Sequence, residues 1–576
     1  MAEIGSIGVG AVHSVSTSGQ IGFVDDDPVV HWGVRADDRW HVARDERAIR
    51  QGIAEDGVSI ETRLRVPGGD IVHRINSTPF KNTSVAVVEI ENETPVPIAV
   101  ALFIRGHGAW ECDGDTLYKN RVPFLRANKP IGDIRVAESE KDLMQAVQLD
   151  EMSLSERGRG VKQGSYLAII FPVPHTTSLR FISQIETDHN SVPAFETLPS
   201  LGDIAKGWHA HFDQAATAEV NEKRIQNILL SARRHLLIGS EQTPMSPYWT
   251  KGVPEYAIPV AIVALSAWGH KTASKRLLLQ LISDQFTNTL HRSSKEEICY
   301  FLWACKEYVL MQQNENDEDV IIGSAIEQIV NLIEMVPRWR FRRRRTDSFI
   351  RLGLESSIDI LRKAQQVEEA RNLEAALPKI YGKNPITGNE SLPSALIDEA
   401  NGPKQILQYL NNYINNSRGI GTFDEIMFIT GETGVFASRE RAQDPFASGL
   451  FLLAFHRALV HRPRNNRSVV ALFPSYSPRW FNIPVEVSDM PSGNGKIGYA
   501  VRWHGSRPAL LWEGQFQEDL MFIAPAFDKD WQSLEIRGEA LLSPQEPKET
   551  PLPLISPTAK RISDASTNPE GSDGFS

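Results

Sequence analysis

Three glutamates in short connecting segments could act as acid and base in hydrolysis. Glu255 follows Pro254 at an expected helix start, and Glu297 ends the segment Ser293-Ser-Lys-Glu-Glu297 at another. Glu432 lies in the glycine-flanked loop Thr430-Gly-Glu-Thr-Gly434. Two carboxyl groups about 6.5–9.5 Å apart, one protonated and one ionised, cleave a glycosidic bond with inversion. We take Glu297 or Glu255 as one member of a candidate pair and Glu432 as the other.

Each of these acids also has a structural interpretation. Ser293 and Ser294, followed by Glu296 and Glu297, form a capping-box signature, in which the acids favour the helix dipole. Glu255 fits the same kind of cap region, and Glu432 fits a surface turn. Asp444 before Pro445 is a good N-cap residue, and capping explains it fully.

Aromatic side chains in a loop could stack on a sugar ring. Tyr248 and Trp249 lie between two expected helices, in the segment Ser246-Pro-Tyr-Trp-Thr250. The alternative is that they anchor this loop against a neighbouring domain. Trp480, Trp503 and Trp512 alternate with apolar strand residues, which indicates core positions instead.

The segment Arg338-Trp-Arg-Phe-Arg-Arg-Arg-Arg345 could bind RNA or an acidic surface, because it mixes cations with aromatics. However, the chain has a net charge of −11, and the acidic segment Asn314–Asp319 could neutralise the run. A helix connector with Trp339 and Phe341 turned inward explains it equally. We find one such patch, and we therefore expect no nucleic-acid partner.

The first 205 residues read as β structure. Apolar and polar residues alternate with the period of half-buried strands, and turns such as Pro67-Gly-Gly-Asp70 separate them. The spacing predicts an antiparallel β-sandwich over residues 1–205. The clearest strands are expected at Val58–Val66, Ile71–Ile75, Ser84–Ile90, Pro97–Ile104 and Tyr166–Phe171.

The next segment, 206–465, has helical periodicity, first seen at Ile225, Ile228, Leu229, Ala232 and Leu236. About ten helices with short connections suit an array of helical hairpins. Beyond the first helix, they are expected at Tyr256–Gly269, Thr272–Phe286, Ser294–Met311, Val320–Val336, Ser348–Gln366, Glu368–Ile380, Pro403–Asn415 and Arg439–Val460.

A small β domain is expected over residues 466–546, with strands at Val469–Phe473, Val485–Val487, Lys496–Trp503 and Ala509–Trp512. Residues 547–576 are rich in Pro, Ser, Thr and charge, which is typical of a disordered tail. The fold class is thus multidomain α+β.

Composition bounds the class of protein. The chain has 576 residues, 23% of them charged and 41% apolar, as in a globular protein. No apolar run reaches the ~18–20 residues that span a bilayer, and we see no secretory signal. Three widely spaced cysteines, at 112, 299 and 305, argue against disulfides or zinc and suggest the cytoplasm. The sequence contains no Gly-x-x-x-x-Gly-Lys-Ser/Thr phosphate loop, no His-Glu-x-x-His and no Cys-x-x-Cys pair, so we expect no metal and no cofactor.

The order of strands, helices and strands resembles the six-hairpin glycosidases, most of all the glucoamylase-like (glycoside hydrolase family 15-like) branch and its uncharacterised bacterial members. The resemblance spans residues 25–545. It implies an N-terminal β-sandwich, a central (α/α)6 toroid and an inverting hydrolase that acts on an α-glucan or oligosaccharide. The residues that carry it are Glu61–Asp70, Tyr248–Gly252, Pro474–Trp480, Val485–Val487 and Tyr499–Gly505.

The chain departs from this family at one element. Its catalytic members share Trp-x-Arg-Asp, whose Arg and Asp hold a sugar ring, and the matching residues here are Trp249-Thr-Lys-Gly252. The carboxylate is lost and Lys251 replaces the planar arginine, so Lys251 is the remaining candidate for a polar contact with substrate. The departure favours an alternative, a non-catalytic glycan-binding or protein-interaction scaffold. The helical segment is also short for a full toroid.

Overall fold

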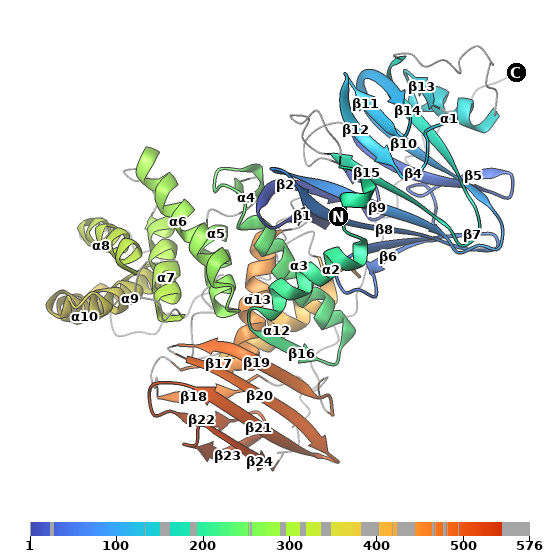
Figure 1. Ribbon diagram of the computed structural model, residues 1–576. Coiled ribbons are helices and arrows are strands. Elements are labelled where there is room, and N and C mark those ends of the chain that lie inside the picture. Colours follow the sequence, from blue (N-terminus) through green and yellow to red (C-terminus); the bar gives the residue numbers. More distant parts are fainter. Residues whose placement is uncertain are drawn as a thin grey trace, which may run out of the picture.

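The computed structural model has three parts along the chain, namely a curled antiparallel sheet, a set of helices and a second β unit (Figure 1). It describes residues 2–22, 28–132, 134–149, 162–184, 193–250, 253, 256–288, 295–311, 318–335, 347–381, 402–417, 419–422, 444–463, 466, 468–475, 480, 482–493 and 495–543. Helices and mainly antiparallel sheets in this order make a multidomain α+β protein. In this described part, no helix has the length and apolar composition to span a membrane.

Fifteen N-terminal strands pair into one sheet. Their alternating apolar residues are buried on the inner face, so that Leu102 lies opposite both Trp32 and Ile169 in the register. The sheet curls, and its two halves share one core instead of forming two separate sheets. The strands are β1 (Ala2–Ser6), β2 (Val9–Val15), β3 (Ile21–Gly22), β4 (Val29–Ala36), β5 (Arg39–Val42), β6 (Ile49–Ile53), β7 (Ile60–Val66), β8 (Gly69–Phe80), β9 (Thr83–Asn92), β10 (Ile98–Asp113), β11 (Thr116–Lys119), β12 (Val122–Ala127), β13 (Ile134–Ala137), β14 (Lys162–Val173) and β15 (Ser178–Gln184).

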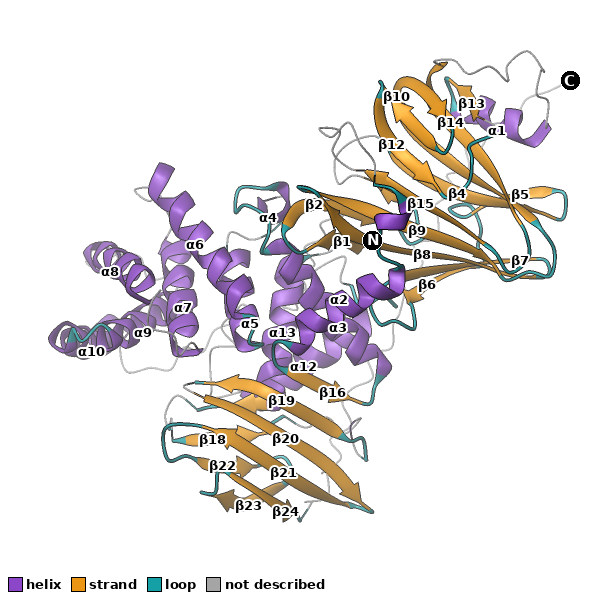
Figure 2. Cartoon of the chain, in the orientation of Figure 1, coloured by secondary structure: helices purple, strands orange, loops and turns teal. Residues whose placement is uncertain are grey.

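Helices α3, α12 and α13 lie between the two β parts, and α6 to α10 extend to one side of them (Figure 2). Every residue of α5 is buried, and α3, α6, α7 and α13 surround it. The bounds confirm the predicted helices to within a few residues, but a closed toroid stays a prediction. The helices are α1 (Glu140–Leu149), which packs on β13 and β14, then α2 (Leu201–Asp213), α3 (Lys223–Gly239), α4 (Pro247–Thr250), α5 (Ala257–Ala267), α6 (Lys271–Asn288), α7 (Lys295–Met311), α8 (Glu318–Met335), α9 (Asp347–Lys363), α10 (Val367–Tyr381), α12 (Gly402–Asn416) and α13 (Pro445–Leu459).

Asp444 begins α13 as predicted. Its side chain accepts a hydrogen bond from the backbone N of Phe446 at 2.8 Å, and Pro445 occupies the first helical turn. Capping therefore accounts for this acid. The helix itself begins at Pro445, and the preceding residues 423–443, which the expected span Arg439–Val460 includes in part, lie outside the described residues.

The second β unit contains a five-stranded and a four-stranded sheet. Its strand β16 lies between α2 and α3 in sequence but pairs with β19, so this unit takes in a strand from within the segment predicted to be helical. Trp480 and Trp512 are buried as predicted, and Trp503 is half-buried. The strands are β16 (Thr217–Val220), β17 (Val460–His461), β18 (Val469–Leu472), β19 (Val485–Ser492), β20 (Gly495–His504), β21 (Arg507–Gln515), β22 (Met521–Ala524), β23 (Asp528–Ser533) and β24 (Arg537–Leu541).

Candidate functional site

The predicted acid pair is only partly described by the structure. Glu297 lies in the first turn of α7 and is half-buried. Glu255, Glu432 and Lys251 lie outside the described residues, as do the residues of the basic run from 338 to 345. The pairing of Glu297 or Glu255 with Glu432 therefore stays a prediction.

Tyr248 and Trp249 are buried in the structure. The Tyr248 hydroxyl donates to the carbonyl O of His235 at 2.7 Å, and Trp249 Nε1 donates to the carbonyl O of Gly239 at 3.1 Å. Both rings pack so closely over Gly239 that a Cβ there would lie 2.7 and 2.8 Å from them. This packing anchors the segment on α3, within the helical part itself, whereas the alternative from the sequence placed the anchor on a neighbouring domain. Stacking on a sugar would require these rings to leave α3.

A polar triplet on α3 is buried, which the sequence analysis missed. Arg233 lies between the rings of Phe212 and Trp268, with its guanidinium carbon 5.0 and 5.5 Å from the two centroids. Its Nη2 donates to the Phe212 carbonyl at 2.8 Å and its Nε donates to His270 Nε2 at 3.0 Å. Burial lowers the pKa of Arg233 to about 9. Next in the chain, Arg234 donates to the carbonyl of Val58 in the N-terminal part.

His235, the third member, joins three parts of the chain. Its Nε2 lies 2.8 Å from Oε2 of Glu3 on β1, and its Nδ1 lies 3.2 Å from Oγ of Ser448 on α13. This Ser-His-Glu arrangement resembles a hydrolytic triad in composition. However, all three side chains are buried, so a substrate has no route to the serine. We interpret it as a structural connection between β1, α3 and α13.

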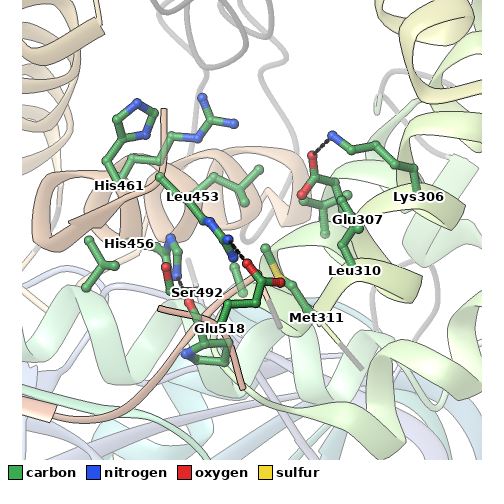
Figure 3. Close-up of a pocket in the computed structure, with 16 residues that line it drawn as sticks. Lys306, Glu307, Leu310, Met311, Leu453, His456, His461, Ser492 and Glu518 are labelled. Carbon is green, nitrogen blue, oxygen red and sulfur yellow. Dashed lines mark hydrogen bonds and ion pairs between the residues drawn. The ribbon is translucent and has the colours of Figure 1, made fainter. Parts of the chain in front are cut away.

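A cavity of about 240 Å³ lies where α5, α7 and α13 meet the second β unit (Figure 3). Its apolar wall comes mostly from the helices. Its polar side chains come from α7, α13 and the second β unit. The lining residues are Val263, Ala267, Lys306, Glu307, Leu310, Met311, Leu453, His456, Arg457, Val460, His461, Arg462, Pro491, Ser492, Gly493 and Glu518.

Two ion pairs contribute to the cavity lining. Lys306 Nζ lies 2.6 Å from Oε1 of Glu307, and Arg462 Nη2 lies 2.8 Å from Oε2 of Glu518 (Figure 3). The side chains of Lys306 and Glu307 are 8% and 13% exposed, so their attraction is little screened by water. Each pair offers both hydrogen-bond donors and acceptors to a ligand.

Two further polar groups line the cavity. His456 Nε2 donates to the carbonyl O of Pro491 at 2.9 Å, and burial lowers the pKa of His456 to about 4. The imidazole is therefore neutral at pH 7 and, with its proton on Nε2, carries a lone pair on Nδ1. Ser492 Oγ is buried and has no hydrogen-bond partner within the described ranges. Buried polar atoms in native proteins nearly always have a partner, so Ser492 points to a ligand or water.

The sequence does contain a signal for this cavity. Between Ile298 and Met311, α7 is apolar except for Lys306 and Glu307, which stand together amid residues that must be buried. A charged pair inside an apolar helix is costly unless it faces a partner or a cavity. His461 and Arg462, which also line the cavity, directly follow Val460, the predicted end of the last helix.

Metal binding finds no support in the described ranges, since they contain no group of three or more His, Cys, Asp or Glu side chains placed to hold an ion.

Comparisons with known proteins give weak likenesses. No family model matches the chain, and no curated protein does. Among solved structures, the chain is similar to a bacterial glucoamylase in complex with acarbose, at 10% identity and a TM-score of 0.42. That match covers 65% of this chain, and this chain spans 65% of the glucoamylase. A polysaccharide lyase matches at 10% identity and a TM-score of 0.21, over 68% of this chain and 73% of the lyase.

Proposed function

We propose that the protein is carbohydrate-active and binds a small saccharide in the cavity between α7, α13 and the second β unit. The observation that carries this proposal is the combination in one cavity of two ion pairs and the hydroxyl of Ser492, which has no hydrogen-bond partner among the residues that the structure describes. Sugar hydroxyls both donate and accept hydrogen bonds, so they match cation–carboxylate pairs. The apolar wall of Val263, Leu310 and Leu453 would contact the C–H face of a ring. The resemblance to glucoamylase-like proteins adds support.

Binding without hydrolysis fits this cavity better than catalysis. Inversion requires one carboxyl group that carries a proton and one that is ionised. Glu307 and Glu518 each form an ion pair with a cation, which suits two ionised carboxylates.

The binding test is calorimetry with purified protein and a panel of mono- and oligosaccharides. We expect at least one sugar to bind, and Ser492→Ala to weaken it about fivefold, as for a lost neutral hydrogen bond. Glu307→Gln should weaken it more, because a charged acceptor is lost. Glu374→Gln, which alters the exposed pair with Arg362, serves as the control. Absence of binding across the panel, or equal affinity in all variants, would overturn the proposal.

Glycoside hydrolysis is the second candidate function. It is favoured by Glu297, which lies half-buried at a helix start. Sugar release from maltooligosaccharides, trehalose and glycogen tests it, with Glu297→Gln and Glu432→Gln beside the wild type. Turnover that both variants abolish would support this pair, and turnover that neither changes would exclude it.

A further inference from the structure

The cavity has a cationic side. Arg457 and Arg462 line it from the end of α13 and the residue after β17, and Lys306 lines it from α7. Glu307 and Glu518 are the two carboxylates among the lining residues, and each already faces one of these cations. The lining thus carries one more formal positive charge than negative.

The surrounding sequence strengthens this bias. From Pro445 to Val485 the chain contains no aspartate or glutamate, in a protein whose net charge is −11. This stretch supplies Arg457, His461 and Arg462 to the cavity. A long acid-free stretch in an acidic chain raises the local electrostatic potential, which attracts anions.

Arg462 is held in place by the backbone. Gly493, in the turn between β19 and β20, has a φ of +60°, and a Cβ at this position would overlap the Arg462 guanidinium. The guanidinium therefore packs directly on this turn, with 15% of the side chain exposed. A guanidinium has five N–H donors, and Nη2 of Arg462 donates to Oε2 of Glu518 at 2.8 Å. An ordered arginine of this kind suits recognition of phosphate or carboxylate.

Cavity size limits the length of the ligand. Pockets for drug-sized ligands are typically ~300–1,000 Å³. At about 240 Å³, this cavity suits a single sugar ring better than an oligosaccharide.

We propose that the cavity takes a monosaccharide that carries an anionic group, either a phosphate ester or a carboxylate. The anion lies on the side of Arg457 and Arg462, and the ring hydroxyls meet Ser492 and the Lys306–Glu307 pair. This inference rests on the proposed function, because it assumes that the cavity binds a sugar.

Calorimetry with four probes tests it, namely glucose, glucose 6-phosphate, glucuronate and inorganic phosphate. We expect glucose 6-phosphate or glucuronate to bind at least tenfold more tightly than glucose, and the tighter of the two identifies the anion. The preference should shrink as salt is raised. Equal affinity for glucose and both anionic sugars would overturn this inference and leave the proposed function standing. If glucose, glucose 6-phosphate and glucuronate all fail to bind, both this inference and the proposed function are overturned. Inorganic phosphate that binds as tightly as glucose 6-phosphate would overturn sugar recognition.

Paired variants separate charge from folding. Arg462→Gln should weaken the anionic sugar about tenfold or more, and Glu518→Gln should tighten it, because a competing carboxylate is removed. A purely structural role of the Arg462–Glu518 pair would make both variants weaken binding. If Arg462→Gln fails to fold, Arg462→Lys keeps the charge but loses the planar fork, and should show a smaller loss. Unchanged affinity in these variants would overturn the proposal.

Discussion

His235 Nε2 and Glu3 Oε2 lie 2.8 Å apart, with both side chains buried and 232 positions between them in the sequence. The contact joins β1 of the N-terminal sheet to α3. Because Ser448 on α13 contacts the other ring nitrogen, one imidazole connects the sheet to two helices. The pair therefore couples the folding of the first strand to that of the helices.

Removal of the Glu3 carboxylate should destabilise the protein strongly. Loss of the partner of a buried hydrogen-bonded group costs about 1–3 kcal/mol, because the other group remains buried with its hydrogen bond unmade. We expect Glu3→Ala to show a loss of this size in chemical denaturation and Glu3→Gln a smaller one, since an amide still bonds to the ring. Glu374→Ala, at an exposed pair, should change stability by less than about 1 kcal/mol. Equal losses at both sites would contradict the role of the buried pair.

Mild acid should destabilise the fold. Burial lowers the pKa of His13 and His73 to about 3 and of His456 to about 4, from 6.5. Between pH 6.5 and 4, the unfolded chain binds protons at these sites that the folded chain does not, so stability falls as the pH is lowered through this window. Each histidine should contribute on the order of 2 kcal/mol between pH 7.5 and 5.

Denaturation midpoints at pH 7.5 and 5 measure this dependence. In His13→Asn the dependence should become shallower, since one titrating group is removed. Stability that stays constant or rises toward pH 5 would show that these imidazoles are not held neutral by the fold.

Two helical glycines should respond oppositely to alanine. At Gly353 in α9, a Cβ would lie 2.6–2.9 Å from Sγ, Cβ and Cα of Cys299 in α7, and the Cα belongs to a packed backbone. Gly353→Ala should therefore force α7 and α9 apart and cost about 1–3 kcal/mol. At Gly323 in α8, no heavy atom of the described residues lies within 4 Å of an added Cβ, so Gly323→Ala should gain about 0.4–1 kcal/mol. Thermal midpoints of the two variants provide the test, and equal shifts would contradict the close α7–α9 contact.

Two turn glycines should separate cavity geometry from backbone strain. Gly493 and Gly505 have φ values of +60° and +63°. Alanine at either position would have to adopt the left-handed backbone conformation, which destabilises the fold by a similar amount, about 1–2 kcal/mol. A Cβ at Gly493 would displace Arg462, whereas a Cβ at Gly505 would have no heavy atom of the described residues within 4 Å. We expect calorimetry to show weaker glucose 6-phosphate binding in Gly493→Ala and unchanged binding in Gly505→Ala. Parallel behaviour in both variants would indicate that Arg462 does not contact the ligand.

Local patterns predicted most of the described helices well. Helices such as α7, expected at Ser294–Met311 and observed at Lys295–Met311, follow from a periodicity contained in the segment itself. The same holds for strands β9 and β20 and for the Asp444 cap, since a cap depends on the next three residues. The sandwich prediction failed in one respect, because the N-terminal strands form one continuous sheet. Strand pairing depends on contacts between distant segments, and no local pattern determines it.

The sequence by itself determined the fold class and placed most of the described helices to within a few residues, because these depend on neighbouring residues. The tertiary structure decided which polar groups are buried. Arg233 and His235 look like the solvated face of an amphipathic helix, but β1 and α13 pack on α3, and Phe212 of α2 contacts Arg233. The cavity was decided in the same way, since Lys306, Arg462 and Ser492 meet only when α7, α13 and β19 pack together. Packing among segments far apart in the chain sets the solvent exposure of each side chain, and with it the chemistry that the side chain can perform.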